Sequence, residues 1–325
     1  MKRKLNILIA CEESQACCRA FRALGHNAYS CDLFDCSGTI FGTDKAEPHP
    51  EWHFNHDITT VLDKSDLTLQ NGEQAVIDGD WDLMIGHPPC TFLASSGAKW
   101  MYHPDDKDKP VEKRRPHPRF PTRRQDQIDG MNFFLLLAKA KVKRIAIENP
   151  VGIMSTKWRK PDQAVQPYMF GDPYSKNTCL WLKNLYPLHP SKETDNHGER
   201  IYFESGKSQP LWYSDGMTKT KTKEERQKWR SKTFPGIARA IAEQWTIQIA
   251  FEEGILDEVE KNIIGEDYIE LLDKMSGGIR YHTSNPNDKI EKKRYPTHFN
   301  QELVNELENR EQALIAEWKN NLPKN

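Results

Sequence analysis

The chain has 325 residues, of which 37% are hydrophobic and 29% are charged, and its formal net charge is −1. That length is sufficient for one large α/β domain with a full hydrophobic core, with or without an appendage. No apolar stretch approaches the ~20 residues that cross a bilayer, which excludes a membrane-spanning helix, and the near-zero net charge excludes polyanion binding by global charge alone.

Short apolar runs alternate with amphipathic segments along the N-terminal part of the chain. Residues 5–10 are apolar in all but one position and predict a buried strand. A helix follows, for which Ser14 is the expected cap and Gly25 the expected end. Residues 27–31 predict a second strand, and the Gly-, Pro- and His-rich residues 33–55 predict an irregular segment.

Further strands and helices continue this alternation. The strands are expected at residues 80–85, 143–147 and 178–182. One helix is expected after Thr122, which forms a capping-box pattern with Gln125, and another at residues 235–249. Residues 100–121 contain five prolines and predict a polar loop.

This order of elements predicts an α/β fold with a doubly wound, mostly parallel sheet and helices on both faces. In such sheets ligands bind beyond the carboxyl ends of the strands. Reactive side chains follow those predicted ends: Cys11, Glu12 and Ser14 after the first strand, Asp32 after the second, and Cys90 and Glu148 after later ones. We therefore expect these residues to line one ligand site.

Cys90 follows two prolines and a tight turn after the strand at residues 80–85. Proline fixes φ, so the turn is stiff and suits a nucleophile that must be held in place. A thiolate adds readily to an electron-poor ring when local positive charge lowers its pKa. The alternative is a structural cysteine buried in a proline turn, which a short motif leaves open.

Glu148 ends the apolar strand at residues 143–147 and precedes Asn149-Pro150. Partial burial there is expected to raise the pKa of its carboxyl, so that it holds a proton and hydrogen-bonds a ring nitrogen. The alternative is an exposed acid that caps the next helix.

Two acids near the predicted second strand and the irregular segment are candidates for nucleotide recognition. Asp32 is placed to accept hydrogen bonds from ribose hydroxyls, and Asp57 with Ile58 is placed to hold an adenine. The alternative for both acids is a turn former.

Positive charge is concentrated from Lys99 to Arg124, where nine basic and four acidic residues give a net charge of +5. Residues 251–325 carry sixteen acids and ten bases, a net charge of −6. The basic segment predicts a phosphate clamp that closes beside Cys90, with a solvated surface loop as the alternative. The candidate nucleic-acid-binding residues are Lys99, Arg114, Arg115, Arg119, Arg123 and Arg124.

In order and spacing, these motifs resemble those of the DNA cytosine C5-methyltransferase family. The run Gly86-His87-Pro88-Pro89-Cys90-Thr91 is similar to the family's Pro-Cys motif. Glu148-Asn149-Pro150, which follows after one more predicted helix and strand, is similar to its Glu-Asn-Val motif. The Phe234–Ala238 segment opens a helix near the place of its late motif, and the resemblance spans about residues 5–249.

The resemblance implies a sheet of the S-adenosylmethionine-dependent methyltransferase (Rossmann-like) type and a covalent mechanism on a cytosine flipped out of double-stranded DNA. Cys90 would add to C6, Glu148 would hydrogen-bond N3, Lys176 would contact the carbonyl oxygen, and S-adenosylmethionine would supply the methyl group to C5. No metal is implied. The cofactor-binding residues would be Cys11, Glu12, Ser14, Asp32, Asp57, Ile58 and Pro88.

Several positions depart from the family pattern. Its glycine-rich first motif is replaced by residues 10–15, and its arginine motif by the Tyr174–Thr178 segment, in which Lys176 keeps the charge but not the planar fork. His87 stands in place of a glycine and Thr91 in place of a glutamine.

The predicted organisation is a catalytic domain at residues 1–250 and a charged helical extension at 251–325. The polar insert at about residues 190–232 is shorter than the family's target-recognition domain, so we expect low or very short sequence specificity. The odd count of seven cysteines and the absence of a secretion signal predict a cytoplasmic protein. We expect a monomer, and the compact architecture resembles phage members of the family.

Three rival interpretations remain open. A pyrimidine methyltransferase of RNA or free nucleotides would use the same chemistry. A catalytically silent DNA-binding relative would keep the fold alone. A zinc site is the third, formed by residues of metal-ligand type that lack a paired Cys-x-x-Cys spacing, namely Cys31, Cys36, His49, His53 and His56.

Overall fold

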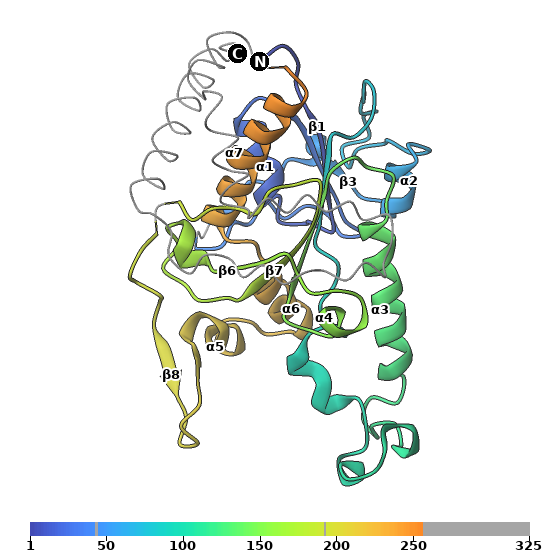
Figure 1. The fold of residues 1–325 in the computed structure, drawn as a ribbon, viewed down its shortest axis with the longest axis vertical. Coiled ribbons are helices and arrows are strands. Elements are labelled where there is room, and N and C mark those ends of the chain that lie inside the picture. Colours follow the sequence, from blue (N-terminus) through green and yellow to red (C-terminus); the bar gives the residue numbers. More distant parts are fainter. Residues whose placement is uncertain (43–44, 192, 256–325) are drawn as a thin grey trace.

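The computed structural model describes residues 1–42, 45–191 and 193–255, and its centre is a seven-stranded sheet (Figure 1). The strand order is β3-β2-β1-β4-β5-β7-β6. The strands are β1 (Asn6–Ala10), β2 (Asn27–Cys31), β3 (His53–Phe54), β4 (Leu83–Gly86), β5 (Ile145–Pro150), β6 (Gln163–Val165) and β7 (Thr178–Lys183).

The sheet is doubly wound and mostly parallel, which confirms the predicted fold class. Strands β1 to β5 pair in parallel, whereas β7 is antiparallel to both of its neighbours, β5 and β6. A parallel connection needs a crossover of a dozen or more residues, usually a helix. Only the 3-10 turn Pro167–Phe170 lies between β6 and β7, so the chain returns in the opposite direction.

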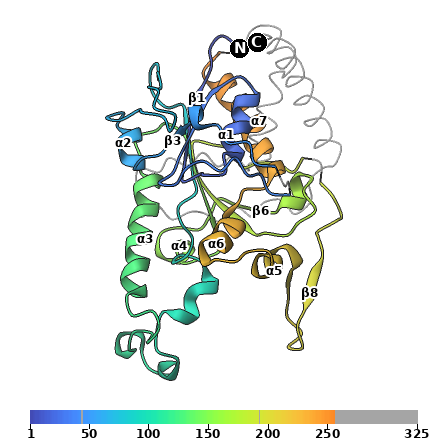
Figure 2. The same cartoon turned by 180° about the vertical axis from the view of Figure 1, so that it is seen from behind.

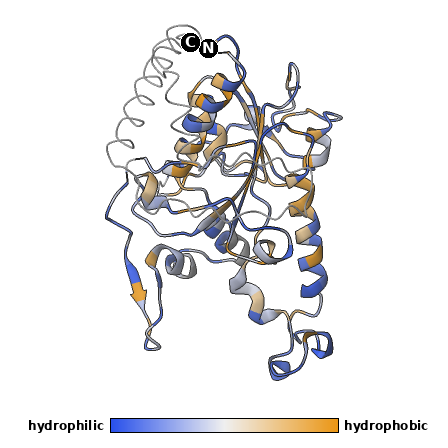
Figure 3. Cartoon of the chain, in the orientation of Figure 1, coloured by the Kyte–Doolittle hydropathy of each residue, from blue (hydrophilic) through white to orange (hydrophobic). Residues whose placement is uncertain are grey.

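Helices cover both faces of the sheet (Figure 2). One core cluster joins the sheet to α1 (Ala16–Ala23) and α7 (Pro235–Glu252), and the other joins it to α2 (Ile58–Leu62) and α3 (Arg123–Ala138). Figure 3 shows the apolar colouring concentrated along the sheet and the helices against it. Every residue of β1 is buried, as expected for a central strand covered on both sides.

Smaller elements surround this core. They are the helices α4 (Met154–Lys157), α5 (Leu211–Thr218) and α6 (Lys223–Ser231), the hairpin of β8 (Arg200–Tyr202) and β9 (Ser208–Pro210), and the 3-10 turns η1 (Pro50–Trp52), η2 (Ser95–Trp100), η3 (Pro104–Asp106), η4 (Val111–Lys113) and η5 (Pro167–Phe170). The predicted extension at 251–325 lies outside the described residues from 256 onward. Among the helices of the described part, none is long and apolar enough to cross a membrane.

The insert between β7 and α7 is held by an aromatic cluster. Phe41 lies with its ring centroid 5.4 Å from that of Trp212 and 4.3 Å from that of Phe234. Trp229 adds a third contact, at 5.9 Å from Phe41. Burial of these rings fixes α5 and α6 beside the start of α7, so the short insert is part of the same packed unit.

Three expected boundaries differ in the structure. The carboxylate of Glu12, not Ser14, caps α1 by accepting hydrogen bonds from the amides of Cys17 and Cys18 at 2.7 and 3.1 Å. Thr122 precedes α3 but forms no capping box, because its hydroxyl bonds Asp126 instead. Glu148 lies inside β5, since pairing with β7 extends that strand through Pro150.

Candidate active site

The strand order reverses between β1 and β4, and ligands of such sheets bind at that switch point. The carboxyl end of β1 leads into residues 11–15, and that of β4 leads into His87, the two prolines and Cys90. The amide of His87 donates to the carbonyl of Ala10 at 2.9 Å, which continues the β1–β4 pairing into the loops. The loops after β1 and β4 therefore both begin at the same carboxyl edge of the sheet.

The loop that carries Cys90 is fastened to the end of β5. Asn149, which is 3% exposed, donates from Nδ2 to the Pro88 carbonyl at 2.7 Å. Beyond it, the amide of Ile153 donates to the Leu93 carbonyl at 2.8 Å and the amide of Ser95 donates to the Val151 carbonyl at 3.0 Å. These contacts hold the nucleophile candidate and the Glu148 strand in register, although the two segments are distant in sequence.

Cys90, Glu148 and Lys176 share one electrostatic environment. Burial raises the pKa of the Cys90 thiol, the Glu148 charge raises it further, and the Lys176 charge lowers it. The Lys176 ammonium donates to the Lys232 carbonyl at 3.3 Å and lies 5.9 Å from the centre of the Phe234 ring. A half-buried thiol, a carboxylate and an ammonium thus interact across this edge of the sheet.

The expected direction of the Glu148 pKa is wrong. Burial does raise it, but the positive charge of Lys176 and the hydrogen bond from His87 outweigh burial, so the pKa lies below its ordinary value. The carboxyl is therefore ionised at neutral pH and accepts hydrogen bonds. Sequence reasoning saw the burial of the strand but not the Lys176 charge and the His87 hydrogen bond brought to it by other segments.

His87 is a site residue to which sequence reasoning assigned no role. Its Nδ1 donates to Glu148 Oε2 at 3.2 Å, and its Nε2 lies 3.9 Å from Cys17 Sγ. Glu12, 3% exposed, completes a group with Cys17 and His87 whose ligand atoms all lie within 4.8 Å of one another. The only signal in the sequence was its position directly before the two prolines.

The predicted cofactor-binding residues gather at the carboxyl ends of β1 to β4. Burial raises the pKa of the Cys11 thiol most, and the charges of Asp32 and Asp57 raise it further. The three side chains therefore lie close together. Cys11 itself adopts a left-handed φ of 60°. Pro88 and Ser14 are buried, as is Glu12, whose carboxylate faces the amides of α1 rather than open space.

Asp57 and Ile58 occupy the start of α2. Asp57 accepts hydrogen bonds from the amide and hydroxyl of Thr59, so it acts as the N-cap of that helix while remaining exposed. Ile58 is 5% exposed and belongs to the core cluster on that face.

Two further features of this edge were not predicted. The buried Oε2 of Glu13 has no hydrogen-bond partner among the described residues, although the charge of Glu13 acts on Lys232 and Asp32. Beside Asp32, the side chains of Leu33 and Phe34 are 71% and 62% exposed. An unpaired carboxylate oxygen beside exposed apolar side chains suits a ligand with both a cationic and a flat apolar part.

The predicted basic loop is a small lobe, residues 99–122, that extends from the start of α3 (Figure 1). Trp100 packs edge-on against His117 and Phe120 at 5.2 and 5.5 Å between ring centroids. Buried Asp106 accepts hydrogen bonds from the Arg115 side chain at 2.9 Å and pairs with Lys109 at 2.8 Å. The lobe therefore has packed rings and internal ion pairs of Asp106 with Lys109 and Arg115.

The six predicted nucleic-acid-binding residues have different surroundings. Lys99, Arg119 and Arg124 are exposed and lie over the rings of Trp100, Phe120 and Tyr102. Arg114 is half-buried and donates to carbonyls of the lobe, and exposed Arg115 pairs with Asp106.

Arg123 differs from the other five because it is only 8% exposed. It donates from Nη2 to the Thr91 carbonyl at 2.9 Å. Arg123 thus links the lobe to the Cys90 loop instead of facing solvent.

The residues proposed for a zinc site lie apart. His53 bonds Ser30 Oγ and the Phe34 carbonyl, His49 bonds Glu51, and the Cys31 thiol donates to the His56 carbonyl. Within the described part of the chain, the side chains of metal-ligand type that come close together are instead Glu12, Cys17 and His87.

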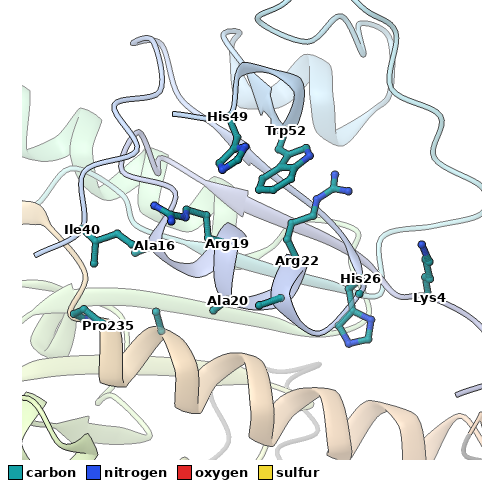
Figure 4. Close-up of a pocket in the computed structure, with 13 residues that line it drawn as sticks. Lys4, Ala16, Arg19, Ala20, Arg22, His26, Ile40, His49, Trp52 and Pro235 are labelled. Carbon is teal, nitrogen blue, oxygen red and sulfur yellow. The ribbon is translucent and has the colours of Figure 1, made fainter. Parts of the chain in front are cut away.

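A groove of about 700 Å³ lies away from this edge, between α1, the His49–Trp52 segment and the start of α7 (Figure 4). Its arginines are already engaged, Arg19 with Glu47 and Arg22 with the Ala28 carbonyl. Cys90, Glu148 and His87 do not line it, so it is separate from the candidate site.

Comparisons with known proteins give a likeness at the level of structure. No protein-family model matches the chain, and no curated protein matches it. One solved structure that is similar is that of a candidate DNA modification methyltransferase encoded within a prophage (E. coli), with 16% identity and a TM-score of 0.30. The match covers 55% of this chain and 46% of the other, so the chain matches less than half of that protein's length. At that TM-score, nothing is carried over from one protein to the other.

Proposed function

We propose that this protein transfers a methyl group from S-adenosylmethionine to C5 of cytosine in DNA, through a covalent adduct with Cys90. The observation that supports this most is that the Cys90 thiol and the Glu148 carboxylate interact electrostatically at the same edge of the sheet. The hydrogen bond from Asn149 to Pro88 fixes their two segments together, and the charge of Glu148 acts directly on the thiol. The catalytic unit would be the domain predicted at residues 1–250.

The chemistry follows from these side chains. The Cys90 sulfur forms a bond to C6 of the pyrimidine, and the electron pair of the C5–C6 double bond moves to C5. Glu148, once it has taken up a proton, gives it to N3 and so neutralises the charge that develops on the ring. Lys176 offers a cation for the carbonyl oxygen of the base. Once C5 has gained its methyl group, a base such as water takes the C5 proton, the electron pair of that C–H bond re-forms the C5–C6 double bond, and the C6–S bond breaks to release the thiolate.

The carboxyl edge of β1 and β2 offers a fitting place for the cofactor. The unpaired oxygen of Glu13 suits a cationic amino or sulfonium group, Asp32 suits ribose hydroxyls, and exposed Leu33 and Phe34 suit the adenine ring. When bound, S-adenosylmethionine would supply an electrophilic methyl group. The residues of this chain would orient it toward C5 and exclude water.

The basic lobe supports DNA as the substrate. Its exposed cations belong to the segment that Arg123 joins to the Cys90 loop through a hydrogen bond to the Thr91 carbonyl. Phosphate contacts of this kind give affinity without reading the sequence. Together with the short insert, they favour low sequence specificity for a cytosine flipped out of double-stranded DNA.

Covalent trapping tests the function. DNA that carries 5-fluorocytosine keeps its fluorine at C5, so the adduct cannot resolve. The protein with S-adenosylmethionine is expected to give a complex with this DNA that survives denaturing electrophoresis. Matched RNA and free 5-fluorodeoxycytidine monophosphate are the controls. Trapping on either of those alone would assign the substrate to RNA or nucleotides, and cofactor binding without any trapping or methyl transfer would indicate a silent relative.

Gly152→Ala is expected to slow methyl transfer by about 100-fold, because small misplacements of reacting groups are that costly. A Cβ at Gly152 would lie 2.1 Å from the Leu93 carbonyl oxygen, which forces the Cys90 and Glu148 segments apart. Gly130→Ala is the matched control, since its Cβ would meet the Leu93 side chain at an ordinary 3.4 Å. Single-turnover methylation checks both variants. Equal rates in the two would show that the contact between the Cys90 loop and the end of β5 does not position the reacting groups.

Removing exposed charge from the lobe is expected to weaken DNA binding. The double variant Arg119→Gln, Arg124→Gln should bind about tenfold more weakly near 0.1 M salt, with a shallower dependence of affinity on salt. Lys139→Gln, Lys141→Gln removes the same charge beyond the opposite end of α3 and should bind as the parent does. Fluorescence anisotropy at three salt concentrations measures both, and equal losses in the two variants would argue against the lobe.

A further inference from the structure

His87 connects two buried carboxyl groups at the switch point. Its imidazole is flanked by Glu148 of β5 on the Nδ1 side and by Cys17 of α1 on the Nε2 side. Glu12, in the loop after β1, hydrogen-bonds the Cys17 thiol. In the His87–Glu148 pair the side chains are 9% and 14% exposed, so water screens this contact poorly.

We propose that His87 is a positioning residue that holds the Glu148 carboxylate through its Nδ1–H and exchanges a proton with it when a pyrimidine enters the site. This role deepens the proposed function and rests on it. The contact between His87, in the loop after β4, and Glu148, within β5, is what reveals it.

The geometry explains why Glu148 needs this partner. A carboxylate on a strand has freedom about its last torsion, and the 3.2 Å hydrogen bond fixes Oε2. The other oxygen is then left for the ring nitrogen of a substrate. Residues that orient a reacting group in this way commonly contribute about 10- to 100-fold, as seen for ligands of metal sites.

The proton exchange takes place in two steps. Protonated His87 first gives its Nδ1 proton to the Glu148 carboxylate. The neutral carboxyl then turns and gives that proton to N3 of the base as the Cys90 sulfur, which has already lost its thiol proton to solvent, bonds C6. His87 is then neutral, Glu148 is again an anion, and the ring carries the proton. When the C6–S bond breaks, the proton returns by the same path.

Titratable groups face this unit from five segments. Glu12 lies in the loop after β1, Cys17 on α1, Cys90 on the loop that carries His87, Lys176 in the segment before β7, and Cys179 on β7. Burial raises the pKa of Glu12, which favours its neutral form and leaves Glu148 as the anion paired with His87.

The first measurement needs no substrate. The Glu148 carboxyl is followed by ¹³C NMR through a pH titration of the ligand-free protein and assigned with Glu148→Gln. His87→Ala should raise its midpoint by about one pH unit or more, because it removes a hydrogen bond and a positive charge that lower the pKa. His87→Asn keeps a donor near the Nδ1 position and should recover part of the shift.

His49→Ala is the matched control, since it removes an imidazole paired with Glu51 at 2.8 Å outside the site. It should leave the Glu148 midpoint in place. A midpoint that is the same in His87→Ala and the parent would overturn the proposal, whatever reaction the protein catalyses. So would zinc bound in equimolar amount by the parent and lost in His87→Ala, because that would assign His87 to a metal.

The second measurement follows methyl transfer in single turnovers from acid to alkaline pH. His87→Ala should be about 10- to 100-fold slower. His87→Asn should recover most of the loss at the alkaline end but not at the acid end, where a proton donor matters. Equal profiles for the parent and His87→Ala would overturn the role in catalysis. If the parent itself neither traps 5-fluorocytosine nor methylates, the proposed function fails, and the carboxyl titration still decides whether His87 holds Glu148.

Discussion

Cys90→Ser should lower the rate of methyl transfer by on the order of 10⁴-fold or more, since loss of the covalent nucleophile removes the whole reaction path. It should also abolish the denaturant-resistant adduct with 5-fluorocytosine DNA. A serine hydroxyl has a far higher pKa than a thiol and is not ionised at neutral pH. The rate is measured as transfer of a radiolabelled methyl group in single turnovers.

Cys36→Ser is the matched control for this change. Cys36 is buried and lies outside the Cys90–Glu148 pair, so the same substitution should leave trapping intact. Cys90→Ser should also bind S-adenosylmethionine and DNA with nearly parental affinity, because the loop is held by Asn149 and by backbone hydrogen bonds rather than by the thiol. An adduct that persists in Cys90→Ser would show that another nucleophile reacts and would refute the proposed mechanism.

Glu148→Gln should slow methyl transfer by about 10²- to 10⁴-fold, the range of a general acid or base in the transition state. The amide keeps the shape of the side chain and can still hydrogen-bond, but it cannot supply a proton to N3. Cys90 remains in place, so trapping on 5-fluorocytosine should become slow rather than disappear. Glu51→Gln, which alters a carboxylate paired with His49, should have no comparable effect.

The same variant should make the Cys90 thiol more reactive. The Glu148 anion raises the pKa of Cys90, so removing that charge should lower the pKa and increase the thiolate fraction at a given pH. In the parent, alkylation of Cys90 by iodoacetamide should rise with pH toward the alkaline side, and in Glu148→Gln the rise should begin at lower pH. A slower reaction of Cys90 in the variant at mildly alkaline pH would contradict the charge coupling between the two groups.

The Glu148 charge also governs the state of the Cys90 thiol before substrate binds. With Glu148 ionised and Cys90 buried, the thiol is held in its protonated form before substrate binds. When a bound base takes up part of the Glu148 charge, that charge raises the pKa of the Cys90 thiol less, and the thiolate forms more easily. The nucleophile would thus become active mainly when a pyrimidine is present, which protects the thiol from unproductive reactions.

Local sequence determined the parallel half of the fold and the order of the candidate catalytic groups. The apolar runs at residues 5–10 and 27–31 became β1 and β2, and Cys90 follows β4 while Glu148 lies near the carboxyl end of β5. These features are local, because strand periodicity, a proline turn and a glycine at a helix end depend on neighbouring residues.

Only the tertiary structure decided which side chains meet. The reversed direction of β7, the Asn149–Pro88 hydrogen bond and the Glu148–His87 contact all join segments that are distant in sequence. The same holds for the burial of Arg123 and for the lowered pKa of Glu148. A pKa or a side-chain contact depends on charges and donors brought by other strands, and that information is absent from a residue's own neighbourhood.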